Sequence, residues 1–67
     1  MKHDWTWVHN YSQYIFSQSC MSRLTITKDY VAISGWDGEK LQKRQRFSDD
    51  LLEAAKILLL EVEDEFL

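Results

Sequence analysis

The end of the chain holds the pattern that most constrains the fold, a run of apolar residues at helical spacing. Ser48 is a good N-cap, and Asp49 and Asp50 would lie in the first turn, where the helix dipole favours negative charge. One apolar stripe then follows at intervals of three and four residues: Leu51, Leu52, Ala55, Leu58, Leu59, Val62 and Phe66. The sequence therefore predicts an amphipathic helix over 49–65, with Phe47 and Leu52 forming a hydrophobic staple at its start.

The segment 22–46 has the residue types and the alternation expected of a β-meander. A two-residue turn at 28–29 pairs residue 24 with 33 and residue 26 with 31. Four apolar side chains then share one face of the first two strands: Leu24, Ile26, Val31 and Ile33. Because burial of an apolar face determines strand register, this arrangement predicts that hairpin.

The turn into the third strand contains Asp37-Gly38 and allows two registers. A two-residue turn pairs Leu41 with Ser34, whereas a three-residue loop over 36–38 pairs Leu41 with Ile33. We favour the loop, because it buries Leu41. The outward residues of a third strand over 39–46 would then be Lys40, Gln42, Arg44 and Arg46, with Lys43 pointing inward near an edge.

Residues 1–21 are rich in aromatic side chains and allow two structures. A helix capped by Asp4 would gather Trp7, Val8, Tyr11, Tyr14 and Ile15 on one face. The residue types favour a strand, and the periodicity mildly favours a helix. We predict a strand that pairs with the meander.

The whole chain, residues 1–67, is thus expected to form one small α+β domain. Its predicted core is a three- to four-stranded antiparallel β-meander packed against one C-terminal amphipathic helix. A core this small supplies about 3–5 kcal/mol, so a partner or a second copy is an expected source of further stability. Cys20 is the only cysteine, which excludes an internal disulfide and suits a reducing compartment. With no apolar run that could span a membrane and no signal-peptide pattern, we expect a cytoplasmic protein.

The sequence contains no motif for catalysis or for a cofactor. His3, Asp4 and His9 are ligand types that suit zinc, but their spacing matches no zinc motif, and we interpret the histidines as surface residues. Two glycines cannot build a phosphate-binding loop, and no serine lies in a nucleophile-elbow sequence. We therefore predict that the protein is not an enzyme and holds no metal.

The charges are divided between two neighbouring segments. A basic run is followed by residues 49–67, where seven acidic residues and Lys56 give a net charge of −6. The basic strand could bind single-stranded nucleic acid, helped by the aromatic Tyr30 and Trp36. The cations for this role would be Lys40, Lys43, Arg44 and Arg46. Because the whole chain carries a net charge of −3, we prefer to pair this strand with the acidic helix and keep nucleic-acid binding as the alternative.

Two features of the helix favour a protein partner. Ile57 and Leu60 lie off the main stripe, although a helix on a sheet needs only one stripe. Acidic residues crowd the negative end of the dipole, where each typically costs about 0.3–1 kcal/mol. A basic surface on a partner could offset this cost. An acidic patch of this kind can also mimic a phosphate backbone and occupy a nucleic-acid-binding site. Small antagonists that phages direct against host machinery share this size and lack of catalytic motifs, which is an association only.

The leading prediction is therefore a non-enzymatic protein-interaction module, a homodimer or a small accessory subunit or inhibitor. Its predicted contact residues are Ile57, Leu60, Glu61, Glu63, Asp64, Glu65, Trp36 and Tyr30.

Overall fold

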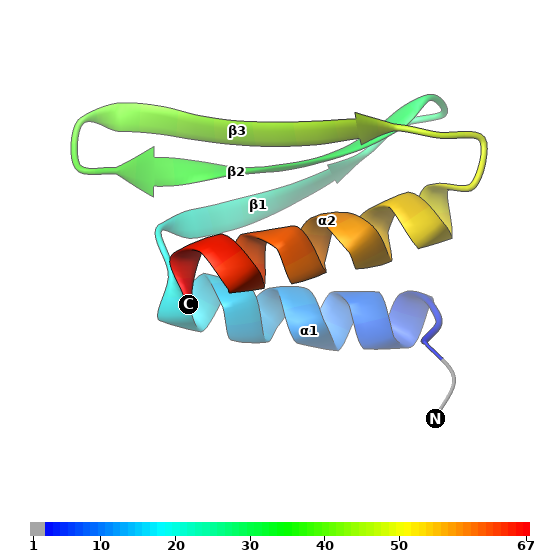
Figure 1. Cartoon of the computed structure of the whole chain (residues 1–67), viewed down its shortest axis with the longest axis horizontal. Helices are drawn as coiled ribbons and strands as arrows, with labels where there is room; N and C mark the ends of the chain where they lie inside the picture. Colours follow the sequence, from blue (N-terminus) through cyan, green and yellow to red (C-terminus); the bar gives the residue numbers. More distant parts are fainter. Residues whose placement is uncertain (1–2) are drawn as a thin grey trace.

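The computed structural model describes residues 3–67 as three antiparallel strands with two helices on one face of the sheet (Figure 1). The elements in chain order are α1 (Trp5–Gln18), β1 (Met21–Ile26), β2 (Tyr30–Asp37), β3 (Lys40–Phe47) and α2 (Leu51–Phe66). The strand order is β1-β2-β3. α2 contacts β2 and β3, and α1 contacts β1 and α2. The predicted α+β class, with a meander packed against the C-terminal helix, is confirmed.

α1 occupies the segment for which we predicted a strand, so that prediction is wrong. Asp4 caps the helix, its carboxylate accepting a hydrogen bond of 3.0 Å from the backbone N–H of Trp7. Val8, Ser12 and Ile15 are buried at helical spacing. Tertiary packing overrides the strand propensity of the aromatic residues, because this spacing lets Val8 and Ile15 join the core that α2 and β2 form.

The first hairpin has the predicted register. Leu24 pairs with Ile33 and Ile26 with Val31. The backbone N–H of Thr27 donates to the carbonyl of Tyr30 at 2.9 Å, which closes the two-residue turn between them.

The second hairpin has neither of the registers considered from the sequence. Asp37 pairs with Lys40 across a two-residue turn, in which Gly38 adopts a φ of 65°. Leu41 therefore pairs with Trp36 and is 60% exposed, so the predicted burial of Leu41 against Ile33 is wrong. The outward and inward residues of β3 exchange places as a result. The inner positions go to Arg44 and Arg46, whose cations meet carboxylates of α2.

A β-bulge distorts β1 where it begins. Met21 pairs with Gly35 and Arg23 with Ser34, so the register shifts between Met21 and Arg23. The bulge brings the backbone of β1 so close to β2 that a Cβ at Gly35 would lie 2.1 Å from the carbonyl oxygen of Cys20. Only glycine fits this position without displacing a strand.

α2 begins two residues later than predicted. Asp50, rather than Ser48, is the N-cap and accepts a hydrogen bond of 3.1 Å from the backbone N–H of Glu53. The predicted staple is also wrong, because Phe47 is 65% exposed and its ring lies 5.3 Å from that of Tyr30. The buried residues of α2 are Ala54, Ala55, Leu58, Leu59 and Val62. They cover more than one stripe, since the helix packs against both the sheet and α1.

Candidate interaction surface

The outer face of the sheet lies on the side away from both helices (Figure 1). It carries several large, exposed apolar side chains. Residues that pair across antiparallel strands share a face. The register therefore places these residues on the outer face: Arg23, Thr25, Tyr30, Ala32, Ser34, Trp36, Leu41, Lys43, Gln45 and Phe47. Among them Trp36 is 59%, Leu41 60% and Phe47 65% exposed. No helix or strand of residues 3–67 covers this face.

The apolar side chains gather at the two ends of the outer face. Trp36 pairs with Leu41 beside the β2–β3 turn. Tyr30 pairs with Phe47 at the opposite end, with their ring centroids 5.3 Å apart. Ala32 lies between the two ends and is only 3% exposed, so it adds no apolar surface there. The face thus offers two apolar contact points separated by a polar strip.

A hollow of about 280 Å³ lies at the Trp36 end of this face. It lies beside Gly35, where the bulge of β1 meets β2. Its lining combines an indole, a leucine, a guanidinium and two hydroxyl groups, supplied by Ser22, Arg23, Ser34, Gly35, Trp36 and Leu41. An apolar or aromatic group that enters against Trp36 therefore has a cation and hydroxyl hydrogen-bonding groups beside it.

The charge on the outer face is positive. Arg23 and Lys43 lie on it, and none of its strand positions holds an aspartate or a glutamate. The sheet region 21–47 contains six basic and three acidic residues, a net charge of +3, although the whole chain is at −3. The negative charge of the protein is concentrated on α2, on the other side of the sheet.

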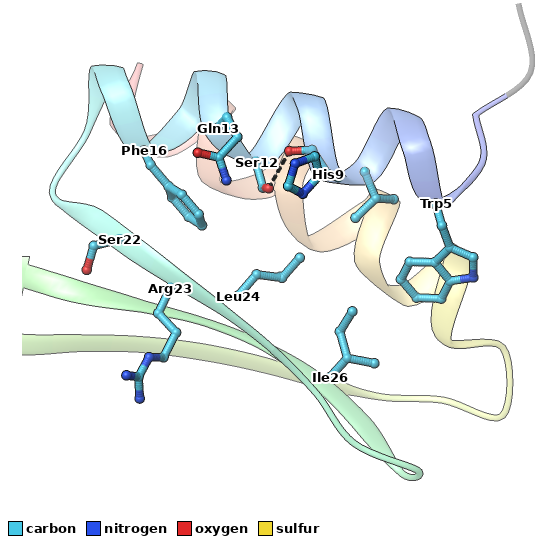
Figure 2. Close-up of a pocket in the computed structure, with 10 residues that line it drawn as sticks. Trp5, His9, Ser12, Gln13, Phe16, Ser22, Arg23, Leu24 and Ile26 are labelled. Carbon is cyan, nitrogen blue, oxygen red and sulfur yellow. Dashed lines mark hydrogen bonds between the residues drawn. The ribbon is translucent and has the colours of Figure 1, made fainter.

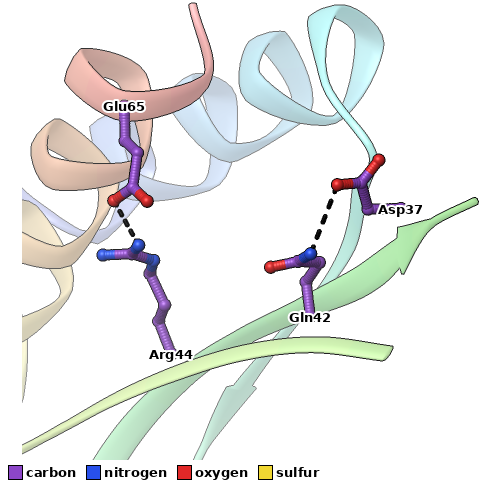
Figure 3. A network of polar contacts seen from close by, with 4 residues as sticks. All are labelled: Asp37, Gln42, Arg44 and Glu65. Atoms are coloured by element: carbon purple, nitrogen blue, oxygen red, sulfur yellow. Dashed lines mark hydrogen bonds and ion pairs between the residues drawn. The ribbon is translucent and has the colours of Figure 1, made fainter. Parts of the chain in front are cut away.

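The inner face holds the other cations of β3 against α2. Arg44 forms an ion pair with Glu65, as Figure 3 shows, and its guanidinium lies 5.6 Å from the centre of the Phe66 ring. Arg46 lies 3.5 Å from a carboxylate oxygen of Glu61. Two of the four cations considered for nucleic-acid binding therefore offset the acidic end of α2. Lys43 points to the outer face, and Lys40 lies exposed beside the turn.

The Arg44–Glu65 pair is expected to add little to stability. Its side chains are 34% and 49% exposed, and water screens such pairs strongly. A double-mutant cycle with Arg44→Gln and Glu65→Gln, followed by urea unfolding, should give a coupling free energy of about 0–1 kcal/mol. This coupling should shrink in molar salt. Lys43→Gln is the control, because Lys43 has no carboxylate partner within residues 3–67. A coupling above about 2 kcal/mol that salt leaves unchanged would contradict this account.

The residues predicted to contact a partner lie on two different sides of the molecule. Tyr30 and Trp36 belong to the outer face of the sheet. Ile57 is half-buried and Leu60 is 48% exposed, both on α2. The acidic residues 61–65 also lie on α2, two of them in the ion pairs with β3. The sequence therefore located part of the outer face but missed Arg23, Leu41 and Phe47, whose positions depend on the register of β3 and on the bulge.

The histidines do not form a metal site with Asp4. The ring of His3 stacks on that of Trp7 at 4.2 Å, and the Asp4 carboxylate caps α1. Within residues 3–67, no three side chains of the metal-ligating types lie close enough together to hold an ion. Neither helix in this part of the chain is long and apolar enough to cross a membrane.

No protein family, curated protein or solved structure matches this chain.

Proposed function

We propose that this chain is a non-enzymatic binding module that holds another protein on the outer face of its sheet. The observation that carries the proposal is the exposure of Trp36, Leu41 and Phe47 on one uncovered face. Large apolar side chains gathered on one surface are typical of interaction sites. Tryptophan, tyrosine and arginine are also the residues that most often dominate the binding energy of interfaces.

The charges of the outer face indicate which kind of protein it suits. Arg23 and Lys43 have no carboxylate beside them on this face, so an acidic partner surface would be complementary. A second copy stacked face to face would bring the cations of both copies into one interface, and like charges in an interface are unfavourable. The proposed partner is therefore a different protein with apolar and acidic side chains.

The partner should lose affinity when the outer face is truncated. Capture of the partner from a native lysate by the wild type, followed by titration with purified partner, gives the reference affinity. Trp36→Ala should weaken binding by at least about 30-fold, the effect of losing a hot-spot tryptophan. Leu60→Ala is the matched control, because Leu60 is also large and exposed but lies on α2. Equal weakening by both variants, or by neither, would reject this face as the site.

The homodimer predicted from Ile57 and Leu60 stays a prediction. If α2 forms such a seam, Ile57→Asp and Leu60→Asp should halve the mass measured by light scattering, and an unchanged mass would remove it. The structure alters the reasoning behind that prediction, since α1 already covers part of α2.

Single-stranded nucleic acid is the second candidate occupant of the outer face. Aromatic side chains that stack on bases and cations that contact phosphates occur together there. It comes second because only Arg23 and Lys43 are available on this face, while Arg44 and Arg46 pair with α2. Fluorescence anisotropy with labelled ten-nucleotide DNA and RNA at low salt tests this candidate, and no binding at micromolar protein would exclude it.

A further inference from the structure

In the part of the chain that the structure describes, the free edge of β1 has unpaired backbone groups, and the strand holds only one charged residue. We propose that this edge and the neighbouring surface of α1 bind an extended peptide of another protein, which joins the sheet as a fourth strand. The site lies on the side of β1 away from β2 and shares Arg23 with the outer face. The peptide has apolar residues at every second position and an acidic residue between them.

Backbone groups of β1 are free to pair with such a peptide. The N–H of Thr27 donates to Tyr30, and hydrogen-bonded pairs recur at every second residue of an antiparallel ladder. Thr25 and Arg23 therefore direct their backbone groups toward β2, whereas Leu24 and Ile26 direct theirs away from it. No residue within 3–67 makes a hydrogen bond to the outward groups of Leu24 and Ile26. These groups are the template for strand addition.

The opposite edge of the sheet is protected in the way that edge strands usually are. β3 carries four basic residues among eight, and such charges discourage the addition of a further strand. β1 has Arg23 as its one charged residue and no proline. The two edges therefore differ in how readily they accept a strand.

A groove beside β1 provides room for the side chains of the peptide. It has a volume of about 320 Å³ and lies between α1 and β1, as Figure 2 shows. Val8 and Phe16 of α1 and Leu24 of β1 give it apolar walls. Ile26, which is 47% exposed, extends the apolar wall of β1. Peptide residues opposite Leu24 and Ile26 would share their face and enter the groove.

The charges around the groove indicate which residues the peptide should have between its apolar ones. The residues that line it include Arg23 and His9 but no aspartate or glutamate. Arg23 lies on the outer face, so a peptide residue opposite it would point to the same side of the extended sheet. An acidic side chain at that position complements the guanidinium.

Hydrogen exchange of the free protein and of its complex tests the backbone part of the proposal. The probe is a set of peptides selected from a random ten-residue display library on the wild-type protein and synthesised with blocked ends. In the free protein the amides of Leu24 and Ile26 should exchange much faster than that of Thr25. A saturating peptide should slow exchange at Leu24 and Ile26 by at least tenfold. Selected peptides that bind without protecting these two amides would overturn the proposal.

Two matched variants on α1 test the groove. His9 and Asn10 are both exposed, but only His9 lines the groove. His9→Trp should fill the groove and weaken the selected peptides at least tenfold, whereas Asn10→Trp should leave their affinity within twofold. Equal affinities for the two variants would overturn the proposal, as would a library that yields no peptide preferring wild type to His9→Trp. Trp36→Ala should not change peptide binding, which keeps this result distinguishable from failure of the outer face.

Discussion

Gly35→Ala should remove most of the stability of this protein. The added Cβ would lie 2.1 Å from the oxygen of Cys20 and 2.5 Å from the Cα of Met21. Both are backbone atoms, so relief requires moving β1 away from β2 and losing part of the ladder between them. We expect a loss of about 3–5 kcal/mol, which is roughly what a core of this size supplies. Thermal unfolding followed by circular dichroism should show a Tm at least about 12 °C lower, or no cooperative transition.

Gly38→Ala is the control, because it replaces a glycine without creating a steric clash. Gly38 has a φ of 65°, but a Cβ there would meet nothing within 4 Å. Its replacement should cost only about 1–2 kcal/mol, the cost of a left-handed conformation for alanine. If Gly35→Ala proved no less stable than Gly38→Ala, the close approach at the bulge would be wrong.

Ile15→Ala has the second largest expected effect. The side chain of Ile15 is fully buried, in the same core as Leu58 and Leu59 of α2. Its truncation leaves a cavity in the core that α1, α2 and the sheet share and should lower the free energy of unfolding by about 2–5 kcal/mol, measured in urea. The result would show that α1 is part of the folded unit.

Tyr14→Ala is the matched control for Ile15→Ala. Tyr14 is the preceding residue of the same helix and is 48% exposed, with its ring 5.7 Å from that of Tyr11. Its loss should cost less than about 1 kcal/mol. Equal losses for the two variants would mean that α1 does not pack as the structure shows.

The division of charge between the two sides of the sheet bears on both proposed sites. Pairing of Arg44 and Arg46 with the acidic end of α2 keeps those cations on the inner face. Arg23 is then the cation that lies beside both the hollow at Trp36 and the groove along β1. Arg23→Glu should therefore weaken acidic partners at either site, whereas Trp36→Ala and His9→Trp separate the two.

Local patterns in the sequence determined the elements whose apolar residues repeat with one clear period. The stripe from Leu51 to Phe66 predicts α2, because an apolar repeat of 3.6 residues over such a length indicates an amphipathic helix. The first hairpin was predictable for a similar reason, since one register alone brings Leu24, Ile26, Val31 and Ile33 to a single face. The predicted cap of α2 was two residues early because Ser48 and Asp50 are both good caps.

Only the tertiary structure decided α1, the register of β3 and the surfaces proposed to bind partners. The residues of α1 suit helix and strand about equally, and packing against α2 is what selects the helix. In β3 we expected Leu41 to be buried, but the structure instead turns Arg44 and Arg46 toward carboxylates that lie far along the chain. The exposure of Leu41 and Phe47 follows from the register of β3, and the hollow beside Trp36 lies at the bulge of β1. The free edge of β1 follows from the order of the strands in the sheet. A sequence pattern read over neighbouring residues does not contain such contacts, because they form only when distant segments meet in the folded chain.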